Sequence, residues 1–174
     1  MKNAVSLLSC AVLSAAVLLV AACSTPNINS AQPIPIPSAL TTQDVKLAII
    51  YALYPSKTPT EWTHVEEMTD SALKAAFPFT YSKMERRDSW FLEEIRSGSV
   101  LVGFDDGDHY MRVEYVIAEG RIKQRIDGSR NLKQSGDSID KDAFEYLGSM
   151  ESKIRQSMGI LSAIKTDYTG KVSH

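Results

Sequence analysis

The chain has 174 residues, of which 44% are hydrophobic and 23% charged, which fits about one domain with a core of its own. Its formal net charge is −2, and a balance this close to neutral argues against nucleic acid as a partner. Cysteine occurs only at positions 10 and 23, so packing rather than a disulfide framework must stabilise the fold.

The first 22 residues are typical of a signal peptide. Lys2 gives a short charged region, and a run of Ala, Val and Leu with small interruptions fills residues 4–22. The sequence Val20-Ala21-Ala22-Cys23 then resembles the lipobox of bacterial lipoproteins, which has an aliphatic residue, two small residues and a cysteine. We therefore expect cleavage after Ala22 and lipidation of Cys23. An ordinary cleavable signal stays open, whereas a membrane-spanning anchor fits less well because the apolar run is short and interrupted.

The lipobox resemblance implies a place in the cell. Lipoproteins of this class carry two or three acyl chains on the cysteine, so the membrane itself is a partner through Cys23. In the sorting rule of the class, an Asp after the cysteine favours the inner membrane. Ser24 stands there, which favours the outer membrane, with the domain facing the periplasm.

Residues 23–40 are predicted to form a tether. Proline occurs at positions 26, 33, 35 and 37, a spacing that leaves no room for a helix or a strand ladder. The Pro-Ile-Pro-Ile-Pro section favours an extended polyproline conformation, which would hold the domain away from the bilayer. A ligand for a proline-binding domain is the alternative function for this segment.

A first helix is predicted from residue 41 to just before Pro55. Thr41 or Thr42 can cap it, and Asp44 suits its first turn. Apolar residues follow at helical spacing and form a core-facing stripe, with Lys46 placed off it.

Residues 56–89 fit two patterns. Residues 62–66 could form a strand, and residues 72–81 fit either a helix or an alternating strand; we favour the strand because Pro78 would break a helix. Residues 66–77 also align without gaps with residues 93–104, each behind a Trp, which suggests a duplication. Two unrelated hairpins of similar composition are the simpler interpretation.

Residues 99–132 are predicted to form an antiparallel meander. A four-residue loop at 105–108 would pair Phe104 with His109 and Val102 with Met111, which puts the apolar residues on one face.

The second turn of the meander is predicted at Glu119 and Gly120. A two-residue loop there would pair Ile117 with Ile122 on the inner face, and Gly120 supplies the positive φ that such a turn needs. On the outer face this register sets a glutamate opposite an arginine. Those residues are Glu114 and Arg125.

The last predicted element is a long amphipathic helix that begins after Asp140 and covers the apolar face of the meander. Its apolar residues recur at steps of three and four: Phe144, Leu147, Met150, Ile154, Met158, Leu161 and Ile164. Gly148 and Gly159 weaken it, which could mark close approach to the sheet or a bend. The fold class is therefore α+β, with a meander of about three to five strands, a short N-terminal helix and a single domain over residues 41–166. Residues 167–174 are predicted to be a flexible tail.

The order from Trp90 to Ile164 resembles a known group of proteins. A Trp, an acidic pair, two alternating strands, Asn131-Leu132 and an amphipathic helix follow one another behind a lipobox and a first helix. This order resembles that of small Gram-negative lipoproteins without an assigned biochemical function. The resemblance implies an order of helix, meander and helix, and it implies no active site.

Few residues point to chemistry. The aspartates of residues 105–108 lack the spacing of a calcium loop, and His64, His109 and His174 lie far apart in the sequence, so no metal or other cofactor is expected. No Gly-x-Ser-x-Gly motif presents a nucleophile, and no catalytic residue is assigned. Arg121, Lys123 and Arg125 alternate onto the outer face of one strand, with Arg130 just beyond. This basic face is the candidate partner-binding surface, although a solvated sheet face is the simpler interpretation.

The leading functional prediction is a lipid-anchored, non-enzymatic structural or accessory protein that binds another envelope component, a protein or the cell wall. One alternative is an envelope hydrolase acting on cell wall or lipid through His109 and the carboxylates of the 105–108 loop. Another is a pilot or assembly factor of a secretion machine.

Overall fold

The structure is a computed structural model that describes residues 31–55, 69–76, 89–132, 134–135 and 138–172. The predicted signal peptide, its cleavage site and the lipidated cysteine lie outside the described residues. The same holds for the predicted strand at 62–66.

A five-stranded antiparallel sheet forms the body of the protein, in the order β1-β5-β4-β3-β2. Its strands are β1 (Ile34–Pro35), β2 (Ser89–Ile95), β3 (Ser99–Asp105), β4 (Tyr110–Ala118) and β5 (Arg121–Arg130). A separate two-stranded ladder joins β6 (Gln134–Ser135) and β7 (Ser138–Ile139).

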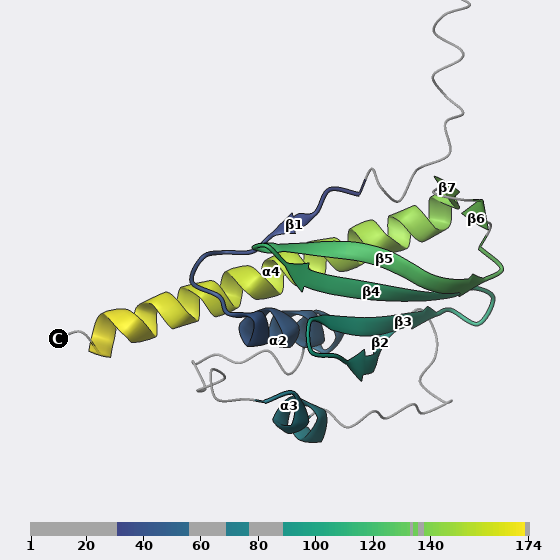
Figure 1. The fold of residues 1–174 in the computed structure, drawn as a ribbon. Helices are drawn as coiled ribbons and strands as arrows, with labels where there is room; N and C mark the ends of the chain where they lie inside the picture. The colour runs from purple at the N-terminus through teal and green to yellow at the C-terminus, as the bar shows by residue number, and fades with distance from the viewer. Residues whose placement is uncertain (1–30, 56–68, 77–88, 133, 136–137, 173–174) are drawn as a thin grey trace, which may run out of the picture.

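Three helices complete the described fold, namely α2 (Thr42–Leu53), α3 (Asp70–Ala76) and α4 (Lys141–Val172). Figure 1 shows α4 running along the sheet and α2 lying beside it, with α3 next to α2 and β2. A five-stranded antiparallel sheet packed against a long C-terminal helix, with a short N-terminal helix, confirms the predicted α+β class.

The core lies between the inner face of the sheet and the helices α2 and α4. Apolar side chains alternate along β3 and β4 onto this face, and α4 contributes one residue per turn. The main contributors are Val100, Val102, Phe104, Met111, Val113 and Tyr115 from the sheet, with Leu147, Met150, Ile154, Met158 and Leu161 from α4.

The register between β4 and β5 is as predicted. Ile117 lies opposite Ile122, and Glu114 lies opposite Arg125. The two-residue turn has φ of 53° at Glu119 and 68° at Gly120, the left-handed values that a tight hairpin of this kind requires.

The register predicted between β3 and β4 is wrong by two residues. Phe104 lies opposite Met111 instead of His109, because the four-residue loop spans residues 106–109 rather than 105–108. Asp106 holds this loop: its Oδ1 accepts the backbone N–H groups of Asp108 and His109 at 3.0 and 2.6 Å. A shift by an even number of residues keeps each side chain on its predicted face. The residues predicted to face the core therefore still do so.

The predicted tether is also wrong in its second half. Ile34 is fully buried and lies opposite Ile122, so β1 adds a short fifth strand at the edge of the sheet. Pro35 is tolerated because proline on an edge strand can face away from the ladder. The folded domain therefore begins before residue 41.

Two predictions about helices need correction. Residues 70–76 form α3 rather than a strand, and its first turn is capped by Thr69, whose Oγ1 accepts the N–H of Ala72 at 3.2 Å. Their counterparts in the suggested duplication belong to the β2–β3 turn and to β3, so the two segments differ in structure. Lys46 is fully buried instead of lying off the core. Its Nζ binds Asp70 Oδ1 at 2.6 Å and Ser97 O at 2.8 Å.

Helix α4 begins as predicted and ends later. Asp140 caps it by accepting the N–H of Asp142 at 3.0 Å. The helix then continues to Val172, through residues predicted to be a tail. A buried ion pair joins this part of the helix to the core: Lys165 Nζ lies 2.9 Å from Asp44 Oδ2 in the first turn of α2.

Candidate functional site on the outer face of the sheet

The basic side chains predicted to share one face of β5 do share it. Arg121, Lys123 and Arg125 are all exposed, and they lie opposite Ala118, Val116 and Glu114 of β4. This is the face of the sheet that points away from α2 and α4. Arg130 lies at the far end of β5, opposite Tyr110, and its guanidinium stands 5.8 Å from the Tyr110 ring centroid.

Glu114 organises the centre of this face. Its side chain is only 7% exposed, and its two oxygens bind two guanidiniums and a hydroxyl. Ser99 Oγ donates to Oε1 at 2.7 Å, Arg96 Nη1 donates to the same atom at 2.9 Å, and Arg125 binds Oε2. The hydrogen bond from Ser99, followed by those from Arg96 and Arg125, holds the pKa of the Glu114 carboxyl below its usual value.

A second group of ionic contacts lies nearer β2. Glu93 accepts the Tyr110 hydroxyl at 2.6 Å and Arg112 Nε at 2.8 Å. Arg112 Nη1 also stands 3.6 Å from Asp127 Oδ2, and the bond to Glu93 raises the pKa of the guanidinium. These contacts join β2, β4 and β5, and two carboxylates share one guanidinium, so this group adds no positive charge to the face.

Among the described residues, the most exposed cationic side chains of the outer face lie along β5. On β3, Leu101 and Ser99 point to the same face and are 1% and 5% exposed. On β5, Lys123 is 55% exposed and its ion pair with Glu119 spans 3.6 Å, which is weak for so exposed a pair. Arg121 has no ion pair with any residue that the structure describes. The cationic surface consists of Arg121, Lys123 and Arg125, and we call it the β5 basic face.

The loop considered for hydrolysis contains an ordered carboxylate. Asp106 Oδ2 lies 3.0 Å from His109 Nδ1 and accepts the Tyr146 hydroxyl at 3.1 Å. The bond to Asp106 raises the pKa of the His109 imidazole. Bonds from His109 and Tyr146 outweigh the effect of burial and lower the pKa of Asp106. These contacts fix the hairpin to the start of α4. No Ser, Thr or Cys of the described residues is bonded to His109.

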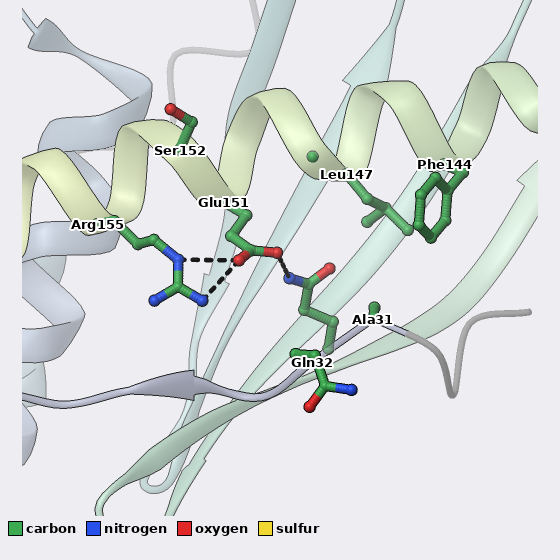
Figure 2. Close-up of a pocket in the computed structure, with 9 residues that line it drawn as sticks. Ala31, Gln32, Phe144, Leu147, Glu151, Ser152 and Arg155 are labelled. Atoms are coloured by element: carbon green, nitrogen blue, oxygen red, sulfur yellow. Dashed lines mark hydrogen bonds and ion pairs between the residues drawn. The ribbon is translucent and has the colours of Figure 1, made fainter.

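A cleft of about 420 Å³ lies beside β5, between the sheet and α4. Phe144, Leu147 and Gly148 give its apolar wall, and Ala31 and Gln32 border it on the other side (Figure 2). Figure 2 also shows Arg155 directed at Glu151, whose Oε1 it binds through Nε at 2.9 Å and Nη2 at 2.7 Å.

The base of the cleft is the inner side of β5. Gln124 Nε2 donates to Glu151 Oε2 at 3.5 Å, and Gln124 lies opposite Tyr115 across the ladder. Burial raises the pKa of the Tyr115 phenol, with a smaller effect from the Glu151 carboxylate. The charged side chains at the cleft, Glu151 and Arg155, thus bind each other, and the wall of the cleft is mainly apolar.

Among the residues with described positions, no three His, Cys, Asp or Glu side chains are grouped to hold a metal ion. None of the helices in the described ranges is long and apolar enough to span a bilayer. No protein-family description, curated protein or solved structure matches the chain.

The sequence pattern identified the β5 basic face and missed its supports. Arg96 and Ser99 reach Glu114 because the β2–β3 turn brings them to the same face, which spacing within one strand cannot show. The cleft was missed too. Its one visible signal is the pair Glu151 and Arg155, four residues apart on a helix.

Proposed function

We propose that this protein is a lipid-anchored component of the bacterial envelope that binds another envelope component without acting as an enzyme. In this proposal Cys23 carries the acyl chains, and the outer membrane holds the protein with its domain in the periplasm. The β5 basic face is the contact surface. The predicted signal peptide with its lipobox supports the anchor.

One observation carries the choice of surface. Glu94 and Glu114 balance the charges of Arg96 and Arg125, so the positive charge left on this face belongs to two exposed side chains. These are Arg121, which has no ion pair with a described residue, and Lys123, whose pair with Glu119 spans 3.6 Å between exposed side chains. Charge arranged in this way favours an anionic partner, because complementary potentials raise the association rate and set the orientation.

Site-specific photocrosslinking in cells tests the proposal. A photoreactive residue at position 118, where Ala118 is exposed and lies opposite Arg121, is expected to give one discrete adduct with an envelope component. The same residue at position 153, where Lys153 is exposed on α4, serves as the control and is expected to give none.

Charge reversal adds a second arm. Arg121→Glu with Lys123→Glu removes the exposed charge and leaves the Glu114 contacts in place, so the adduct should be lost while the protein stays folded. Lys153→Glu is the matched control. Absence of an adduct at position 118, or its persistence after the double reversal, would contradict the proposal.

The hydrolase alternative draws on one feature, the contact between Asp106 and His109. A carboxylate that orients an imidazole is a common part of hydrolytic sites, yet the remaining parts are not assigned. His109→Ala in the folded protein tests it: an envelope activity that disappears would favour hydrolysis. The pilot or assembly alternative is tested by whether neighbouring genes encode a secretion machine.

A further inference from the structure

The outer edge of β5 is paired at one end only, within the part of the chain that the structure describes. β1 ends its pairing at Ile122, and Ile36 N–H donates to Gly120 O at 2.9 Å. In an antiparallel strand, every second residue directs its N–H and C=O to the same side. The backbone groups of Gln124 and Ile126 therefore face the same edge as those of Ile122, and no described residue bonds to them there.

This stretch of edge borders the cleft described above. Gln124 forms part of the cleft, and Phe144, Leu147 and Gly148 line its α4 side. An extended chain laid along Gln124 and Ile126 would alternate its side chains between the two faces of the sheet. One set would enter the cleft against Phe144 and Leu147. The other set would lie beside the side chains of the β5 basic face.

We propose that β5 receives an extended acidic peptide segment of a partner protein as an added strand, with apolar side chains of that segment in the cleft. The inference rests on the function proposed above and specifies how the partner binds. Main-chain hydrogen bonds at an open edge supply affinity, and pockets for alternate side chains supply specificity.

Charge complementarity favours this occupant over two others. Pairing of β5 with β5 of a second copy would place the positive charges of Lys123 and Arg125 next to those of the other copy. Like charges opposite each other across a ladder are destabilising. Residues 24–30 of the chain itself contain no acidic side chain to match them. A segment that alternates acidic and apolar residues matches both faces of the edge, with its carboxylates beside Lys123 and Arg125.

The test uses full-length lipidated protein in detergent and a synthetic peptide of alternating Glu and Val. Two variants of the peptide accompany it: one with alternate amides N-methylated, and one with Lys in place of Glu. N-methylation removes ladder hydrogen bonds and keeps the charges. We expect it to weaken binding by about tenfold, since two such bonds contribute together about 1.4 kcal/mol. The Lys peptide should not bind.

The protein arm uses two glycines of α4 that both face open space. Gly148→Leu places a side chain in the cleft and should weaken binding by about tenfold. Gly159→Leu makes the same change outside the cleft and should leave binding unchanged. Circular dichroism confirms that both variants are folded. Amide exchange at Gln124 and Ile126 should slow when the Glu peptide is bound.

Several results would overturn the inference: equal binding of the N-methylated peptide, equal binding of the Lys peptide, unchanged binding to Gly148→Leu, or unchanged exchange at Gln124 and Ile126. Dimers that the Glu peptide dissociates would show that a second copy occupies the edge, and would also overturn it. If Gly148→Leu retains the cellular crosslink from position 118 while the double charge reversal abolishes it, strand addition is wrong and the proposed function stands.

Discussion

The buried ion pair between α2 and α4 allows the sharpest prediction of stability. Asp44 is fully buried, Lys165 is 10% exposed, and Lys165 Nζ stands 2.9 Å from Asp44 Oδ2. Asp44→Asn keeps the side-chain size and an oxygen that can accept Thr41 N–H, which now donates to Oδ2 at 2.7 Å. The substitution therefore removes the charge and leaves the helix cap in place.

The expected loss follows from the cost of an unpaired buried charge. Removing one partner of a buried pair costs about 3–5 kcal/mol. Because Lys165 is slightly exposed and can turn outward, we expect the lower end, about 3 kcal/mol. That corresponds to a Tm lower by about 6–12 °C for a domain of this size. Glu145→Gln in the exposed pair with Lys141 is the control, with an expected change below about 0.5 kcal/mol.

A double-mutant cycle with Lys165→Met separates the pair from its surroundings. Chemical denaturation should give a double variant that is more stable than the sum of the single losses predicts, by about 1–3 kcal/mol. Single losses that add within about 0.5 kcal/mol, or an Asp44→Asn loss no larger than that of Glu145→Gln, would refute the reasoning.

Three further predictions concern the sheet and its loops. Gly103→Ala should lower the free energy of unfolding by about 1–3 kcal/mol, because a Cβ there would overlap the ring of Phe91. Gly98→Ala, in open space, should change it by less than about 0.5 kcal/mol. The pKa of His109 is raised in the folded protein, so its bond to Asp106 stabilises the fold fully below pH 6.5. This stabilisation is lost as the pH rises through the raised pKa. The Tm of the wild-type protein should therefore fall over this pH range, and His109→Gln should flatten that fall. The pKa of Glu114 is lowered in the folded protein, so the stability that its carboxylate contributes is complete above pH 4.5 and is lost as the pH falls through the lowered pKa. If the stability of Glu114→Gln falls with acid as steeply as that of the wild type, this prediction is contradicted.

The sequence predicted the elements whose signals are local. A tight turn with Gly120 fixed the β4–β5 register, because a two-residue loop leaves one pairing that matches apolar to apolar. Helix α2 was predicted from its cap and from Pro55, and α4 from its apolar spacing. These signals lie within the element that they specify or directly beside it.

The predictions failed where distant residues decide the structure. Lys46 is buried because Asp70 and the carbonyl of Ser97, far along the chain, receive its ammonium. Lys165 near the end of α4 is buried because it binds Asp44, a residue 121 positions away. The spacing of residues within one element cannot predict such partners.

The β3–β4 loop shows a third kind of failure. Residues 105–109 are five consecutive polar or glycine residues, which allow two positions for a four-residue loop, and both keep the apolar faces intact. In the structure Asp105 Oδ1 accepts the N–H of Gly107, and Asp106 Oδ1 accepts those of Asp108 and His109, in a loop over residues 106–109. The sequence therefore predicted the face of each residue on these strands and not its partner.

The candidate site divides in the same way. Alternation along one strand was enough to place Arg121, Lys123 and Arg125 on one face. Their support by Glu114 was partly visible in the predicted pairing with Arg125. The cleft was not predictable, since its walls come from the segment before β1, from β5 and from α4, which are far apart in the sequence.

The anchor at Cys23 is tested most directly by metabolic labelling with an alkyne fatty acid, followed by mass spectrometry of the N-terminal peptide. The proposal predicts that the mature protein begins at Cys23, carries the label and sediments with outer membranes. Cys23→Ser should abolish both labelling and processing at this site. A Cys23→Ser protein that stays in the membrane at the mass of the processed form would contradict the proposal.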